Sequence, residues 1–120
     1  MSNARLSIRV DLASGDHIGP GKIALLETIA QTGSISAAAR QLGMSYRRAW
    51  LLVEAINDAL REPAVSAATG GQHGGGATLT PTGERIIDLY RAIEGHAHTL
   101  ASEEFRALSR IARKGAKSRA

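Results

Sequence analysis

The sequence predicts a mainly α-helical domain that carries one small pair of β-strands and ends in a long helix. Two observations support this prediction. Apolar residues recur at helical spacing over most of the chain, and a glycine-rich segment with short extended flanks interrupts them within residues 64–80. The chain has 120 residues, 43% of them apolar, which suits one domain with a single hydrophobic core. We expect this domain to span residues 1–115, with a frayed basic tail at residues 115–120.

The composition excludes several classes of protein. Cysteine is absent, which excludes disulfide scaffolds, thiolate metal sites and cysteine nucleophiles, and suits a reducing compartment. The longest unbroken apolar run, residues 49–53, is far shorter than the roughly 20 residues of a membrane-spanning helix. The first residues lead into no apolar segment of the kind that a secretory signal needs. These features predict a cytoplasmic protein that makes no contact with a membrane.

The charge of the chain is modest and unevenly distributed. Fifteen Lys and Arg residues against eleven Asp and Glu residues give a formal net charge of +4. The segment from residue 110 to the end is basic and holds no acid, with Arg110, Arg113, Lys114, Lys117 and Arg119. Without this tail the chain is nearly neutral, so composition alone does not establish nucleic-acid binding, and the argument depends on local pattern.

The chain begins with an alternating segment and then a helix. Apolar and polar residues alternate over residues 5–12, which predicts a half-buried strand. Glycines and a proline break the chain over residues 14–21. Apolar residues then follow helical spacing over residues 20–32, and Gly33 lies where a helix would end. A first helix is therefore expected at residues 20–32.

Two further helices are expected close together in residues 34–60. Ser36 is expected to cap a short helix at residues 37–42, which Gly43 ends. Ser45 is expected to cap a longer helix that runs from Tyr46 to about residue 60. A tight three-residue connection between two helices predicts a helix-turn-helix.

The next segment, residues 64–80, is expected to form a β wing. Pro63 stops the preceding helix, and short extended pieces at residues 64–69 and 77–79 flank a run of glycines. The run does not fit a phosphate-binding loop, because no Lys-Ser or Lys-Thr pair follows it. The alternative to a wing is a flexible surface loop. If the segment is a wing, its candidate DNA contacts are Thr69, Gly70, Gly71, Gln72 and His73.

The last helix is expected to run from residue 81 to residue 114, with a candidate break near Gly95 or at residues 101–102. Its apolar residues step by four and three positions, which is the spacing of a helix–helix interface. We call this row the seam, and it consists of Ile86, Tyr90, Ile93, Ala97 and Leu100. A seam of this length predicts a dimer interface, and the alternative is packing onto the core of the same chain.

The helix from Tyr46 carries the residues that most favour DNA binding. Its exposed face is basic in the first turn, at Arg47 and Arg48, and acidic later, at Glu54 and Asp58. Such a helix would enter a DNA groove by its tip, because its later turns would bring carboxylates to phosphates. Arginines are unfavourable at the positive end of a helix dipole and therefore invite an external anion. The alternative is an ordinary solvated helix start. The candidate DNA-binding residues of this region are Ser34, Ser36, Ser45, Tyr46, Arg47 and Arg48.

Other chemistry has little support in the sequence. His96 and His98 point to different sides of a helix, and no cysteine or carboxylate pair stands at ligand spacing, so no metal site is expected. Trp50 is expected to pack at the edge of the core. No catalytic set of residues is present, so we expect a protein that is not an enzyme and that holds no cofactor.

Three stretches of the sequence resemble known families. Residues 32–39, Thr-Gly-Ser-Ile-Ser-Ala-Ala-Ala, resemble the start of LysR-type helix-turn-helix domains. The segment Ser-Tyr-Arg-Arg-Ala-Trp at residues 45–50 and the glycine-rich stretch at residues 68–80 together resemble the N-terminal winged-helix domain of ModE, the molybdate-dependent regulators. The resemblance extends from about Arg5 to Leu100.

The resemblance implies a winged helix-turn-helix dimer that binds a palindromic operator in double-stranded DNA. It further implies a transcriptional regulator of genes for molybdate uptake or molybdoenzymes. ModE regulators bind molybdate through a separate C-terminal part, and because this chain ends at Ala120 we expect it to lack a molybdate-binding domain of its own. The alternative function is a protein-interaction module that works with a separate sensor protein.

Overall fold

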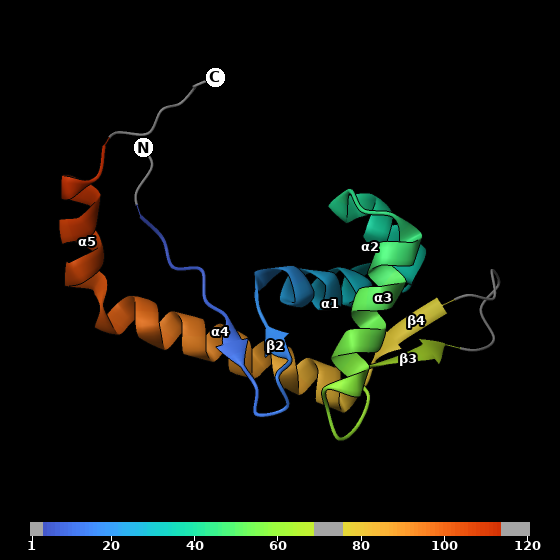
Figure 1. Ribbon diagram of the computed structural model, residues 1–120. Helices are drawn as coiled ribbons and strands as arrows, with labels where there is room; N and C mark the ends of the chain where they lie inside the picture. Colours follow the sequence, from blue (N-terminus) through green and yellow to red (C-terminus); the bar gives the residue numbers. More distant parts are fainter. Residues whose placement is uncertain (1–3, 69–75, 114–120) are drawn as a thin grey trace.

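The computed structural model describes residues 4–68 and 76–113. Five helices and two small antiparallel sheets make up this part of the chain (Figure 1). In order, these elements are β1 (Val10–Asp11), β2 (His17–Ile18), α1 (Pro20–Thr32), α2 (Ile35–Leu42), α3 (Tyr46–Asp58), β3 (Val65–Ala68), β4 (Gly76–Leu79), α4 (Pro81–Leu100) and α5 (Ser102–Ile111). The predicted fold class, mainly α with a small β wing, is confirmed.

Helix α1 forms the centre of the domain. It contacts α2, α3, α4 and β4, and its position among them can be followed in Figure 1. Its four large apolar side chains, Ile23, Leu25, Leu26 and Ile29, are fully buried. Each such burial stabilises the fold by about 1.5–3 kcal/mol, so this helix contributes much of the core. Because Leu25 and Leu26 are adjacent, they point to different sides of α1, and the helix needs neighbours on both.

Helices α2 and α3 pack closely through small residues. The two helices contact each other, and Ala38 and Ala39 of α2 and Ala49 of α3 are buried. Gly43 ends α2 with φ of 72°, a left-handed conformation that glycine adopts without steric cost. The backbone N–H of Met44 then donates to the carbonyl of Ala39 at 2.9 Å, which fixes the turn into α3. The expected helix-turn-helix is therefore present.

The N-terminal cap of α2 differs from the prediction. Ser34, rather than Ser36, caps this helix, and its hydroxyl accepts a hydrogen bond from the N–H of Ala37 at 2.9 Å. A cap residue needs an extended backbone, which Ser34 has, with φ of −155° and ψ of 146°, whereas Ser36 already lies in the first helical turn. The cap of α3 is the expected one, since Ser45 accepts from the N–H of Arg48 at 3.0 Å.

The N-terminal segment is extended, but only its end forms a strand. Val10 and Asp11 pair with Ile18 and His17, and the expected strand over residues 5–12 is therefore too long. The alternation is still visible in the burial, because Leu6, Ile8 and Val10 are partly buried while the residues between them are exposed. An extended chain lying on a packed surface gives the same alternation as a strand without needing a partner strand.

The last helix is divided in two. Ala101, with φ of −103° and ψ of 21°, separates α4 from α5, and this is one of the two positions where a break was expected. Helix α5 ends at Ile111, earlier than the expected residue 114. Figure 1 shows α5 standing at an angle to α4, at the end remote from the wing. The sequence shows this bend only as a one-residue slip in the apolar spacing after Leu100.

Hydrogen bonds from residues near the middle of α4 hold this helix against the core. The guanidinium of Arg91 donates to both carboxylate oxygens of Glu27 on α1, at 3.0 and 2.8 Å, and to Glu94 at 2.7 Å. These hydrogen bonds raise the pKa of Arg91 above its ordinary value. The adjacent Tyr90 is buried, and its hydroxyl donates to the carbonyl of Ile8 at 2.8 Å, which holds the N-terminal segment in place.

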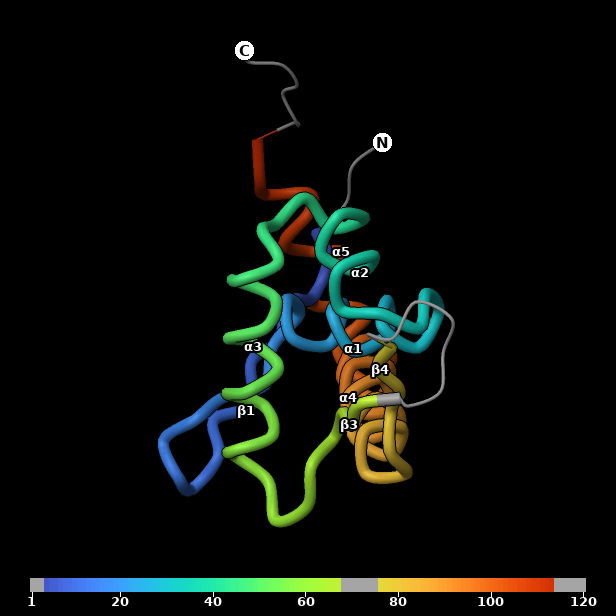
Figure 2. The backbone as a smooth tube through the Cα atoms, turned by 90° about the vertical axis from the view of Figure 1, so that its right-hand side faces the viewer, coloured from blue at the N-terminus to red at the C-terminus, as the bar shows by residue number. Residues whose placement is uncertain are grey.

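The end of α4 together with α5 projects from the core as an arm. The radius of gyration is 17.1 Å, whereas a compact domain of this length has one of about 14 Å. Figure 2 views the molecule along a direction in which α4 is foreshortened, with the wing strands lying against its near end. None of the helices within the described residues is long and apolar enough to cross a membrane.

The start of α4 is tightly packed against Ala64, the residue that precedes wing strand β3. Thr80 caps the helix by accepting from the N–H of Gly83 at 3.0 Å, and its hydroxyl donates to the carbonyl of Pro63 at 2.7 Å. A Cβ added at Gly83 would collide with the carbonyl oxygen of Ala64. The contact with Ala64 thus requires a glycine at position 83.

We predict that Gly83→Ala destabilises the protein. The new methyl group would force the α4 start away from Ala64, which we expect to lower the free energy of unfolding by about 1–3 kcal/mol. Urea denaturation measures the change. The matched control is Gly95→Ala in the same helix, where nothing lies within 4 Å of the added Cβ and where higher helix propensity should raise stability by about 0.5–1 kcal/mol. Equal stability of the two variants would contradict the packing argument.

Candidate nucleic-acid interface

The first turn of α3 presents an exposed cationic tip. Tyr46, Arg47 and Arg48 are all exposed, and the side chain of Tyr46 keeps 54% of its accessible surface. Within residues 4–68 and 76–113, neither arginine forms an ion pair. The helix dipole adds positive potential at the same place, because Tyr46 is the first residue of the helix. The tip therefore attracts an anion from outside the chain.

The two faces of α3 are arranged as the sequence predicts. Ala49, Val53 and Ile56 are buried against the core. On the opposite side, Glu54 and Asp58 are exposed, and they lie further along the helix than the two arginines. The positive and negative ends of this exposed face are separated by two to three helical turns. Only the tip is suited to approach phosphate groups, and this favours entry into a groove by the N-terminal end.

Two surface hollows flank the tip. The first, with a volume of about 270 Å³, is lined by Ser45, Arg47, Arg48, Leu51 and Leu52. The second, of about 520 Å³, lies between the start of α2, the first half of α3 and the wing strands. Tyr46 and Trp50 line the second hollow together with Ser36. Trp50 was expected to pack at the core edge, but 41% of its surface is exposed.

The base of the wing lies beside this surface. Strands β3 and β4 pair antiparallel, from Val65 opposite Leu79 to Ala68 opposite Gly76. The N–H of Ala77 donates to the carbonyl of Gly33 at 2.9 Å, which attaches the wing to the end of α1. The predicted contacts at the wing tip, Thr69, Gly70, Gly71, Gln72 and His73, lie outside the described residues.

Asn57 connects α3 to the wing, and the sequence reasoning did not identify it. Its side-chain oxygen accepts from the N–H groups of Ala64 and Val65, at 2.8 and 3.2 Å, and its amide nitrogen donates to the carbonyl of Val65 at 3.1 Å. These bonds fix the position of the wing relative to the α3 tip. The only signal in the sequence is an amide residue near the end of an amphipathic helix, shortly before a proline.

The serines at the start of α2 have different surroundings. The hydroxyl of Ser34 already accepts from Ala37 as the helix cap, so its primary role is structural. Ser36 is exposed on the rim of the hollow beside Trp50. Ser45 also caps a helix, but it is exposed and its hydroxyl hydrogen can still be donated to a phosphate.

The residues of the seam differ in how far they are buried. Ile93 and Leu100 are exposed, the latter with 87% of its surface, and Ile86 and Ala97 are partly buried. Tyr90, in contrast, is only 3% exposed because it packs in the core of its own chain, and this burial raises the pKa of its hydroxyl. Tyr90 is therefore unsuited to contact a second chain, and the exposed surface of α4 lies on either side of it.

The comparison with known families agrees with this geometry. Residues 21–84 match the family described as "Bacterial regulatory helix-turn-helix protein, lysR family". The chain belongs to this family. The match covers α1 to the start of α4, and so includes the cationic tip and the wing. The family is one of regulatory proteins, in agreement with the prediction that the chain is not an enzyme.

The curated relatives show which type of helix-turn-helix domain the chain contains. The chain is 53% identical over 92 residues to the molybdenum-pterin-binding protein MopB of Rhodobacter capsulatus, covering 76% of this chain and 34% of that protein. It is 41% identical over 91 residues to the molybdenum transport protein ModE of Azotobacter vinelandii, covering 76% of this chain and 33% of that protein. The helix-turn-helix domain is thus of the ModE type, and the chain spans about a third of the length of these relatives.

A solved structure supports the fold. The crystal structure of a MarR-family transcription regulator aligns with 76% of this chain and 61% of its own, with a TM-score of 0.58 and 24% sequence identity. At this level of identity the likeness concerns the winged-helix architecture alone.

We predict that Asn57→Ala lowers the free energy of unfolding by about 2–4 kcal/mol, because it leaves the buried N–H groups of Ala64 and Val65 without their acceptor. Urea denaturation monitored by circular dichroism measures this loss. The neighbouring Asp58→Ala, at an exposed site on the same helix, is the control and should change stability by less than about 0.5 kcal/mol. If both variants behave alike, Asn57 does not hold the wing.

Proposed function

We propose that the protein is a sequence-specific, DNA-binding transcriptional regulator of the ModE type. The observation that carries this proposal is the exposed pair Arg47 and Arg48 at the positive end of α3, without ion pairs in the described part of the chain. In a lysR-family helix-turn-helix, α3 takes the place of the helix that enters the major groove. Such a regulator acts where bacterial DNA lies, in the cytoplasm.

The proposed docking brings the tip of α3 into the major groove. Arg47 and Arg48 carry guanidinium groups that can donate two hydrogen bonds to the O6 and N7 atoms of a guanine. The hydroxyls of Ser45 and Tyr46 can donate to backbone phosphates, and so can Ser36 on the adjacent rim. The wing would lie over the neighbouring backbone, since its base is fixed beside the same surface by Asn57.

We expect Arg47→Ala and Arg48→Ala to weaken operator binding by about 1–3 kcal/mol each and to relax the preference at one position per half-site. Fluorescence anisotropy with a labelled duplex from the gene's own upstream region measures the affinity. The control is Arg61→Ala, which lies beyond the opposite end of α3. Unchanged operator affinity in both tip variants would overturn the assignment of α3 as the recognition helix.

We further propose that the protein acts as a homodimer through α4. A palindromic operator requires two copies, and exposed apolar side chains recur along this helix at Leu89, Ile93 and Leu100. An exposed apolar row of this length is unusual for a monomer, and burial against a second copy would remove it from water. The spacing of the two α3 tips would then be set by the pairing of the long helices.

Ile93→Asp should produce monomers, because it places a charge in the middle of the proposed interface. Analytical ultracentrifugation at micromolar concentration reports the state, and we expect the monomer to bind the operator weakly. Ala92→Asp adds the same charge one residue away, about 100° around the helix, and should leave the dimer intact. A wild-type protein that is already monomeric would contradict the dimer proposal.

The genes that we propose to be controlled are those for molybdate uptake or molybdoenzymes. The support is that two curated relatives carry molybdenum in their names, together with identities of 53% over 92 residues and 41% over 91 residues. The alternative function is a protein-interaction module that serves a separate sensor. The salt dependence of binding distinguishes this function from DNA binding. DNA binding through several phosphates falls steeply with salt, while a mainly apolar protein interface does not. The anisotropy titration is therefore run at two salt concentrations, with and without molybdate.

A further inference from the structure

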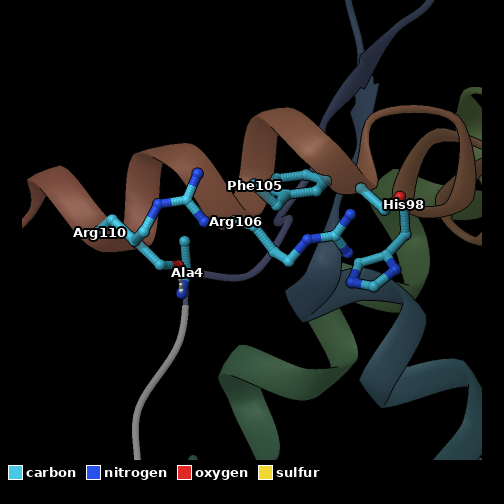
Figure 3. A pocket seen from close by; sticks show the side chains of 7 residues that line it. Ala4, His98, Phe105, Arg106 and Arg110 are labelled. Atoms are coloured by element: carbon cyan, nitrogen blue, oxygen red, sulfur yellow. Dashed lines mark hydrogen bonds between the residues drawn. The ribbon is translucent and has the colours of Figure 1, made fainter.

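A second cationic site lies at the corner between α4 and α5. A hollow of about 450 Å³ opens there, and three separate segments line it. Ala4 comes from the N-terminal segment, His98 from the last turn of α4, and the remaining residues from one face of α5 (Figure 3). We call this the corner hollow. The proposed DNA-binding function uses none of its residues.

Two arginines on α5 give the corner hollow its charge. Arg106 and Arg110 lie four residues apart, so they share one face of the helix, and both side chains line the hollow. Like charges at this spacing destabilise a helix unless an anion lies between them. No carboxylate lines the hollow, and neither arginine has an ion pair in residues 4–68 or 76–113. An external anion would relieve the repulsion.

Neutral hydrogen-bond donors surround the two arginines. The hydroxyl of Ser109 accepts from the N–H of Ala4 at 2.9 Å, so its own hydrogen is available for another acceptor. Ser102, the first residue of α5, adds a second hydroxyl. The imidazole of His98 stacks on the ring of Phe105, with centroids 5.3 Å apart, and even a neutral imidazole carries one N–H donor. The polar lining thus supplies donors from both helices and can surround an oxygen-rich anion.

We propose that the corner hollow binds a small tetrahedral oxyanion, such as phosphate, sulfate or molybdate. Guanidinium groups bind oxyanions with two parallel, charge-assisted hydrogen bonds, and two of them can hold a doubly charged ion. The volume leaves room for the ion and part of its water shell. The bound ion would join the N-terminal segment, α4 and α5 across the break at Ala101, and so fix the angle of the arm.

The position of the hollow favours a free ion over a DNA phosphate. Figure 1 shows α5 at the opposite end of α4 from the wing and the base of α3. Helix α4 has 20 residues and is therefore about 30 Å long, so a duplex held at the α3 tip lies far from Arg106. The oxyanion proposal is independent of the DNA-binding proposal, and either can fail without the other.

Isothermal titration calorimetry with phosphate, sulfate and molybdate, at constant ionic strength, tests the proposal. We expect at least one of these ions to bind the wild-type protein, and Arg106→Gln and Arg110→Gln each to weaken that binding about tenfold. Arg85→Gln, an exposed α4 arginine outside the hollow, is the matched control and should bind as the wild type does. Amide NMR shifts should change at Ser102, Phe105 and Ser109 on addition of the ion.

Three results would overturn the proposal. The first is the absence of binding for all three ions, and the second is an equal loss in Arg85→Gln, which would indicate general charge screening. The third comes from an operator titration of the same variants without oxyanion. We expect it to match the wild type, whereas weaker operator binding in the Arg106 and Arg110 variants, with no oxyanion bound, would assign these arginines to DNA phosphates.

Discussion

The fold depends on the complete burial of α1. Its large apolar side chains point to more than one side, so α2 and α3 must cover one part of the helix while α4 and β4 cover the others. The hydrophobic effect alone would accept many arrangements of these neighbours, because it has no direction. Small residues and specific hydrogen bonds select the one observed. Ala38, Ala39 and Ala49 allow α2 and α3 to approach closely, and Arg91 aligns α4 with α1 through Glu27.

The wing is positioned by polar contacts rather than by a core of its own. A two-stranded ribbon is marginally stable in water, so β3 and β4 need support from outside. Asn57 supplies it from α3, the carbonyl of Gly33 from the end of α1, and Thr80 from the start of α4. Because the same helix α3 carries the cationic tip, the wing base and the tip keep a fixed relation to each other. Preorganisation of this kind reduces the ordering cost of binding an extended partner such as DNA.

The two cationic sites differ in the surroundings of their arginines. At the α3 tip the arginines are exposed beside the positive end of a helix, which suits a large polyanion. At the corner hollow the arginines line a concave site together with hydroxyl groups, which suits a small ion. The arm between the sites is fastened to the core near its middle by Tyr90 and Arg91 and bends at Ala101. A ligand at the corner would therefore act on the end of the arm and leave the core unchanged.

The sequence alone determined the class of fold, the helix-turn-helix, the wing strands and the exposed basic tip, because these follow from local spacing. Helical and strand periodicity, a glycine at the turn and a serine cap are properties of neighbouring residues. The choice of Ser34 over Ser36 as a cap depended on the backbone conformation that follows Gly33. The exposure of Trp50, the burial of Tyr90, the role of Asn57 and the corner hollow were decided only by tertiary structure. Each depends on which distant segment packs alongside, and the short-range patterns of a single sequence do not contain that information.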